Sequence, residues 1–117
     1  MALFIASINS GSNGNCYYIG NEQDAVLVDA GISCREIERR MKRLELSMEK
    51  VRAILISHEH SDHIKGVEVL SRKYRLPVYI TTPTLLYSRL KIDPSLTFSF
   101  KAFAPIRIHT FFIHAFP

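Results

Sequence analysis

The feature that most constrains this chain is a strongly polar run placed directly after an apolar strand. Residues 51–56 are apolar apart from Arg52 and predict a buried strand, and Ser57-His-Glu-His-Ser-Asp-His63 follows at once. Val67, Leu70 and Tyr74 then recur at helical spacing, which predicts a helix from about residue 64 to 74. So many titratable side chains between a strand and a helix need something to neutralise and order them.

Four side chains of this run have the spacing of a metal site. His58 and His60 are two residues apart, so on an extended loop they point to the same side and can share one metal. Asp62 and His63 lie at the turn into the helix, where they can reach a second ion roughly 3.5–4 Å away. Imidazole and carboxylate ligands suit zinc and are also compatible with manganese or iron. Two alternatives stay open: Asp62 only caps the helix, or the cluster is coincidental in a purely structural domain.

The remaining pattern predicts an α+β chain. Ser33 and Glu36 form a capping box at the start of one helix, and Thr82 with Pro83 supplies the N-cap and first position of another. Short strands separated by polar turns near the N-terminus indicate an antiparallel meander. We expect strands at residues 3–8, 16–19, 25–28, 51–56 and 77–80, and helices at about 34–44, 64–74 and 83–90.

Composition indicates a folded globular domain with a small positive charge. The chain has 117 residues, 47% of them hydrophobic, and a formal net charge of +4. We expect a cytoplasmic protein without a membrane segment, because no apolar run approaches roughly 20 residues and the start lacks a basic leader. Cys16 and Cys34 have no CxxC pairing and are expected to be partly buried thiols. The basic excess, including Lys65, slightly favours a phosphodiester such as nucleic acid as substrate.

The motif and two upstream segments resemble the metallo-β-lactamase superfamily of metal-dependent hydrolases. Leu27-Val-Asp-Ala-Gly31 and the meander precede the HxHxDH run in the order typical of that family. Ser10-Gly-Ser-Asn-Gly-Asn15 before Cys16-Tyr-Tyr-Ile19 is further similar to the YycJ (WalJ) subgroup, whose members are regarded as nuclease-like hydrolases. The resemblance implies the N-terminal half of a four-layer αββα sandwich, a β-meander plus helices on one face. Residues 1–117 would then be one domain without its C-terminal half.

The resemblance also implies roles for individual residues. His58 and His60 would bind the first metal, and Asp62 and His63 the second, where they would be the catalytic residues. Asp29 would support the metal loop from behind the ligands, unless it only forms an Asx turn before Gly31. The complete protein would then use two ions, zinc being expected, to activate a hydroxide that hydrolyses phosphodiester bonds of nucleic acid.

Several features leave alternatives open. Residues 10–15 carry no P-loop signature and form either a loop at the mouth of the metal site or a plain hairpin connection. His109 and His114 are expected to be strand residues and not metal ligands. Six of the seven phenylalanines follow residue 97, so we expect a homo-oligomer that buries aromatic strands. The alternative function is a non-catalytic, self-associating metal-binding fragment, and the pairing would bury several of Phe100, Phe103, Phe111 and Ile113.

Overall fold

A computed structural model describes residues 2–11, 14–57, 64–100 and 105–114. Within them, six strands form one mixed sheet in the order β1-β2-β3-β4-β5-β6, and a separate hairpin joins β7 to β8. The strands are β1 (Phe4–Asn9), β2 (Cys16–Gly20), β3 (Ala25–Val28), β4 (Val51–Leu55), β5 (Val78–Ile80), β6 (Thr97–Ser99), β7 (Pro105–Ile108) and β8 (Phe111–His114). The helices are α1 (Cys34–Arg43), α3 (Val67–Tyr74) and α4 (Thr82–Ser88), with single 3₁₀ turns at Met48–Lys50 and Pro94–Leu96.

The sheet changes from antiparallel to parallel at β3. The pairs β1–β2 and β2–β3 are antiparallel, which confirms the predicted meander. From β3 onward each neighbouring pair is parallel, because a helix or 3₁₀ turn carries the chain back between strands. The carboxyl ends of β3, β4 and β5 therefore meet at one edge of the sheet.

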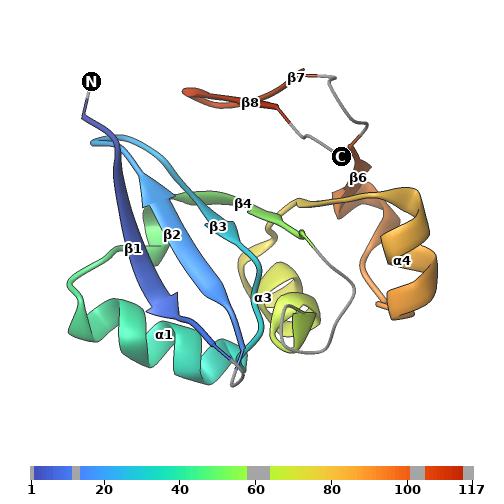
Figure 1. Cartoon of the computed structure of the whole chain (residues 1–117), viewed down its shortest axis with the longest axis horizontal. Helices are drawn as coiled ribbons and strands as arrows, with labels where there is room; N and C mark the ends of the chain where they lie inside the picture. The colour runs from blue at the N-terminus through green and yellow to red at the C-terminus, as the bar shows by residue number, and fades with distance from the viewer. Residues whose placement is uncertain (1, 12–13, 58–63, 101–104, 115–117) are drawn as a thin grey trace.

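Helices α1 and α3 cover one face of this sheet, as predicted (Figure 1). Their inner residues Ile37, Met41 and Leu70 are at most 1% exposed. Burying a side chain of this size contributes roughly 1.5–3 kcal/mol to folding. The Ser33 hydroxyl caps α1 by accepting from the Glu36 N–H, which confirms the predicted N-cap.

Three helix boundaries differ from the prediction. Helix α1 ends at Arg43, one residue before the expected end, and Leu44 is its C-cap. Ile64 has helical backbone, but a turn at residues 65 and 66 interrupts the expected helix, so that α3 begins at Val67. Helix α4 is capped by Thr81 in place of Thr82, and it ends at Ser88 because Arg89 has a left-handed φ of 56°. At α4 the difference arises because Thr81 and Thr82 are adjacent and either one could cap the helix.

The hairpin β7–β8 packs on the sheet face opposite α1 and α3 (Figure 1). Ile108 is buried against this face, and Phe100, Phe111 and Ile113 are partly buried in the same cluster. The chain's own sheet thus covers part of the aromatic surface that we expected a second copy to cover. Phe103 lies outside the described residues, and Phe112 is 59% exposed. Self-association stays a prediction, which sedimentation would test.

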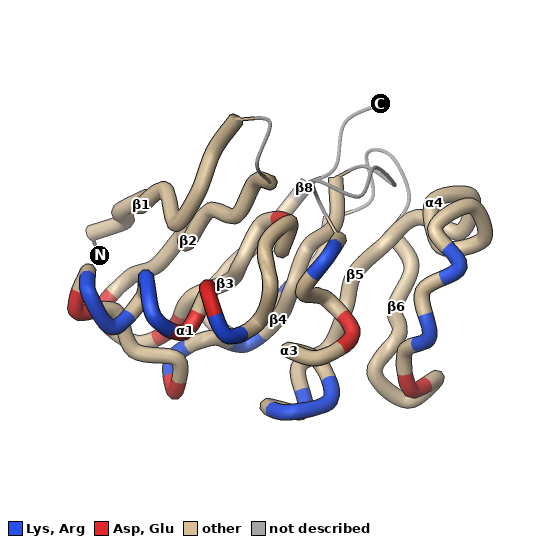
Figure 2. Tube along the Cα trace, turned by 90° about the horizontal axis from the view of Figure 1, so that it is seen from below, with Lys and Arg blue, Asp and Glu red and all other residues tan. Residues whose placement is uncertain are grey.

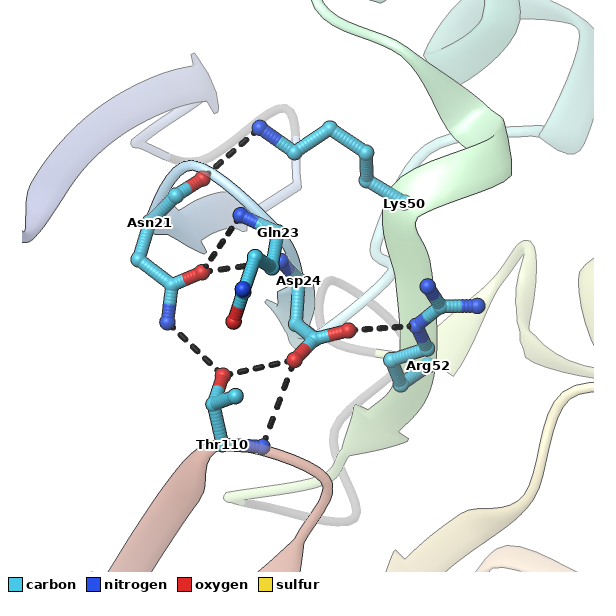
Figure 3. Close-up of polar contacts among 6 residues, drawn as sticks. All are labelled: Asn21, Gln23, Asp24, Lys50, Arg52 and Thr110. Atoms are coloured by element: carbon cyan, nitrogen blue, oxygen red, sulfur yellow. Dashed lines mark hydrogen bonds and ion pairs between the residues drawn. The ribbon is translucent and has the colours of Figure 1, made fainter.

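A buried carboxylate ties the hairpin to the sheet (Figure 3). Asp24 Oδ2 accepts from the Thr110 hydroxyl at 2.6 Å and from its backbone N–H at 3.3 Å, while Oδ1 pairs with Arg52 Nε at 2.7 Å. Hydrogen bonds from Thr110 and from Arg52, with a smaller contribution from the Arg52 charge, hold the pKa of Asp24 below its ordinary value. Asn21 Nδ2 donates to the same Thr110 hydroxyl at 2.8 Å, so the turn before β3 is hydrogen-bonded to the turn between β7 and β8.

The same hairpin corrects one assignment. His109 lies in the turn between β7 and β8 with a φ of 51° and is exposed, so it is not the strand residue we expected. His114 is the last residue of β8, as expected. In the part of the chain that the structure describes, no helix is long and apolar enough to cross a membrane.

Candidate metal centre

The carboxyl edge of the parallel strands leads directly into the polar run. The Asp29 N–H, just past β3, donates to the Leu55 carbonyl oxygen at 2.7 Å. The Ile56 N–H, just past β4, donates to the Tyr79 carbonyl oxygen of β5 at 2.9 Å. Backbone pairing therefore continues beyond the strands on both sides of β4 and fixes the point from which residues 57–63 depart.

Asp29 holds the residue that precedes His58. Its carboxylate is 3% exposed and accepts from the Ser57 N–H at 2.8 Å and from the Ser57 hydroxyl at 2.6 Å. Asp29 has a left-handed φ of 64°, which aspartate tolerates better than most residues. The Gly31 N–H donates to the Asn15 carbonyl oxygen at 2.8 Å, which disfavours an Asx turn as the role of Asp29. The geometry is that of a support for the start of the polar run.

The segment after Asp29 also holds the far side of that run. The Gly66 N–H donates to the Ala30 carbonyl oxygen at 2.7 Å. A Cβ at Gly66 would lie 2.3 Å from the carbonyl oxygen of Ile32, so only glycine allows this approach. Residues 29–32 therefore anchor the chain on both sides of residues 58–63.

The glycine-containing loop packs on the same segment. It joins β1 to β2, as a plain hairpin connection would, and a Cβ at Gly14 would lie 2.5 Å from the Gly31 carbonyl oxygen. Asn9 Nδ2 donates to the Gly14 carbonyl oxygen, and Arg40 of α1 donates to Asn9 Oδ1. The described part of the loop is thus fixed beside the segment that begins with Asp29.

Alanine substitutions at Gly14 and Gly11 distinguish the effect of this close backbone contact from the effect of a positive φ alone. Gly14 and Gly11 both have positive φ, of 112° and 93°, but Gly11 has no atom near its would-be Cβ within 4 Å. We expect Gly11→Ala to cost about 1 kcal/mol and Gly14→Ala about 3 kcal/mol, because the second also forces backbones apart. Denaturant unfolding measures both, and equal losses would contradict the packing described here.

Both cysteines are buried more completely than predicted. Cys16 is 0% and Cys34 5% exposed, in place of the partial burial expected. Burial, with a smaller contribution from the charge of Asp29, raises the pKa of the Cys16 thiol to about 12. Burial likewise raises the pKa of the Cys34 thiol. Both thiols are therefore protonated at neutral pH and unsuited as metal ligands without rearrangement.

The predicted ligands themselves, His58, His60, Asp62 and His63, lie outside the described residues. Their convergence at the end of β4 stays a prediction. Among the residues that the structure describes, no three His, Cys, Asp or Glu side chains come together as a metal site. The candidate site thus consists of the polar run together with the supports that flank it.

Sequence reasoning missed two of these supports. Ser57 belongs to no motif. Its position directly before the first histidine was the only feature of the sequence that could have indicated a supporting role. Gly66 interrupts a helical pattern, which often marks a close backbone approach or a cap. Asp29, by contrast, was singled out from the sequence, and its carboxylate accepts from the Ser57 N–H; its role behind the metal ligands stays a prediction.

Comparison with known proteins agrees with this description. Residues 10–111 match the model of the metallo-beta-lactamase superfamily. The chain is 41% identical over 119 residues to "Exodeoxyribonuclease YycJ" of Bacillus anthracis, covering 95% of the chain and 45% of that protein. It is 45% identical over 75 residues to "Exodeoxyribonuclease WalJ" of Streptococcus pneumoniae serotype 2, covering 64% of the chain and 28% of that protein.

A solved structure shares the fold. The Rm3 metallo-beta-lactamase superposes with a TM-score of 0.74 at 22% identity, over 96% of this chain and 48% of that one. The chain therefore spans less than half the length of each of these relatives. The α+β architecture of sheet and helices is the one found in half of such a structure.

Proposed function

The chain belongs to the metallo-β-lactamase superfamily, and on that premise we propose that it is the N-terminal part of a hydrolase that cleaves phosphodiester bonds in DNA. The proposal rests on one observation. The Asp29 carboxylate accepts hydrogen bonds from both the N–H and the hydroxyl of Ser57, immediately before the HxHxDH run. The printed names of the two sequence relatives, both exodeoxyribonucleases, support DNA as the substrate. The ligands that complete the site would lie in the other half of the protein.

Membership of this superfamily implies divalent metal ions, and the residues present suit them. Buried carboxylates near metal sites commonly orient the ligands, and the buried Asp29 carboxylate holds Ser57, the residue before His58. We assign His58 and His60 to one ion and Asp62 and His63 to a second, with zinc as the expected metal. When bound, such ions supply a hydroxide nucleophile at neutral pH and neutralise charge on the phosphoryl group.

The chain's own residues would act by positioning. Asp29 fixes the backbone at Ser57, and Gly66 fixes the backbone beyond the run, so His58 and His63 would be held from both ends. Ligands held in this way need little reordering when metal binds. Lys65, exposed next to Gly66, would add positive charge beside a bound phosphate.

Nuclease activity is the direct test of this proposal. The complete protein should release nucleotides from end-labelled DNA, with activity lost in a chelator and restored by zinc or manganese. A thioester and a lactam are assayed in parallel, as the alternative substrates for a metal-dependent hydrolase of this superfamily. Hydrolysis of either one, without hydrolysis of DNA under any metal, would contradict the proposal.

A further inference from the structure

Arg40 extends from helix α1 to the end of strand β1. Its Nη1 donates to the Ile8 carbonyl oxygen at 3.4 Å and to Asn9 Oδ1, while its Nε lies 3.5 Å from Glu36 Oε1. Arg39, the preceding residue of the helix, also pairs with Glu36, at 2.9 Å, but its side chain is 61% exposed against 35% for Arg40. Basic and acidic residues follow one another along α1 (Figure 2), and the contact with Asn9 distinguishes Arg40 from its neighbour.

The Asn9 amide joins α1 to the loop between β1 and β2. Its Oδ1 accepts from Arg40 and its Nδ2 donates to the Gly14 carbonyl oxygen, so both ends of the amide are used. A guanidinium group can only donate hydrogen bonds, so Arg40 selects the orientation in which the amide oxygen faces it. The amide nitrogen is then directed at Gly14. Arg40 therefore determines how Asn9 holds the loop.

The loop in turn packs on residues 29–32, the segment that anchors the polar run. A Cβ at Gly14 would lie 2.5 Å from the Gly31 carbonyl oxygen, and the Gly31 N–H donates to the Asn15 carbonyl oxygen at 2.8 Å. Asp29, two residues before Gly31, accepts the hydrogen bonds from the residue that precedes the run. A loop that moves away would thus remove a hydrogen bond from the backbone that carries Asp29.

We propose that Arg40 is a positioning residue for the candidate metal centre, acting through Asn9 and the loop between β1 and β2 on the segment that contains Asp29. Supports behind metal ligands raise metal affinity because the ligands reorder less when the metal binds. The inference rests on the proposed function, whose metal centre it concerns, but it does not depend on DNA being the substrate.

The test is the zinc affinity of the complete protein, measured by competition with a chromogenic chelator. Arg40→Ala and Asn9→Ala should each weaken zinc binding by about three- to tenfold, less than the loss of Asp29, because they act further from the ligands. The Asn9→Ala, Arg40→Ala double variant should bind zinc as Asn9→Ala does, because both substitutions interrupt the same contacts. Arg40→Lys should recover part of the affinity, since lysine keeps the charge and one donor group.

Arg39→Ala is the matched control. It removes the same charge from the same helix and also breaks an ion pair with Glu36, but it leaves the Asn9 contact intact. This variant should bind zinc as wild type does. An equal loss of affinity in Arg39→Ala and Arg40→Ala would assign the effect to the charge of α1 and overturn the positioning role.

Amide hydrogen exchange of the metal-free protein is a second readout, which separates positioning from a loss of overall stability. Arg40→Ala should accelerate exchange at the N–H groups of Gly31 and Ser57 more than at the N–H of Ile54, a core residue that donates to the Pro77 carbonyl oxygen. Equal acceleration at all three groups would show that Arg40 only stabilises the fold, which overturns the proposal.

The outcomes also separate this inference from the proposed function. Wild-type protein that hydrolyses DNA, with unchanged zinc affinity in Arg40→Ala and Asn9→Ala, overturns the positioning role alone. Weaker zinc binding in both variants of a protein that hydrolyses a thioester or a lactam in place of DNA supports the positioning role and overturns the proposed substrate. Wild-type protein that binds none of zinc, manganese and iron overturns both proposals.

Discussion

Replacing Asp29 should weaken metal binding by about 10- to 100-fold and reduce hydrolysis by a similar factor, the usual effect of removing a support behind metal ligands. The carboxylate is buried and holds both the N–H and the hydroxyl of Ser57. Without it, the residue before His58 loses the acceptor that fixes its backbone. Metal affinity, measured by competition with a chromogenic chelator, is the primary readout.

Three substitutions distinguish positioning from strain. Because Asp29 has a positive φ, Asp29→Ala adds backbone strain of roughly 1–2 kcal/mol to the lost hydrogen bonds. Asp29→Gly removes the carboxylate without that strain, and Asp29→Asn keeps one oxygen acceptor and tolerates the same φ. We expect the glycine variant to bind metal weakly and the asparagine variant to recover part of the affinity. A glycine variant with wild-type metal affinity would show that Asp29 does not position the site.

Among the side-chain hydrogen bonds described, those of Asp24 should contribute most to stability. Replacing Asp24 should lower the free energy of unfolding by about 2–3 kcal/mol. Asp24→Ala leaves Thr110 and Arg52 without their shared acceptor and frees the β7–β8 hairpin from the turn before β3. Thr110→Val removes only the hydroxyl and should cost about 1 kcal/mol. Glu22→Ala, an exposed carboxylate of the same turn, is the control and should be near neutral. Denaturant unfolding of the four proteins measures these differences.

The Asp24 contribution should depend on pH in one direction. Thr110 and Arg52 hold its pKa below the ordinary value of 3.8, so the charged form is the one stabilised by folding. The contribution is complete above that value and is lost as the pH falls through the lower folded pKa. The difference between wild type and Asp24→Ala should therefore shrink on going from pH 7 toward pH 2. A difference that stays constant over this range would contradict the charge-assisted contact.

The sequence predicted those strands and helix ends that depend on neighbouring residues alone. Alternating and continuous apolar runs predicted β1 to β5, and the capping side chain of Ser33 predicted the start of α1. The attachment of the hairpin was not predictable, because it depends on Asp24 and Thr110, which are 86 residues apart. His109 was misplaced for the same reason, since nothing local marks its turn.

In the candidate site, too, the features set by local sequence were predicted and those set by long-range contacts were not. The spacing of the histidines and Asp62 predicted a metal-binding run, because ligand spacing is a local property. The supports at Ser57 and Gly66 depend on backbone contacts with residues 29–32, more than 20 residues away along the chain. Such contacts leave only weak traces in a single sequence, a serine before the first histidine and a glycine inside a helical pattern.

The most direct test of the central claim is to locate the metal in crystals of the complete protein by anomalous scattering at the zinc edge. We predict density for two ions at the carboxyl end of β4, with nitrogen atoms of His58 and His60 at about 2.0–2.1 Å from one ion. Asp62 and His63 should contact the other ion, and Asp29 should still hold Ser57. In a His58→Ala, His60→Ala double variant the first ion should be absent. Metal bound elsewhere on the protein, or these four side chains directed to different faces, would contradict the account.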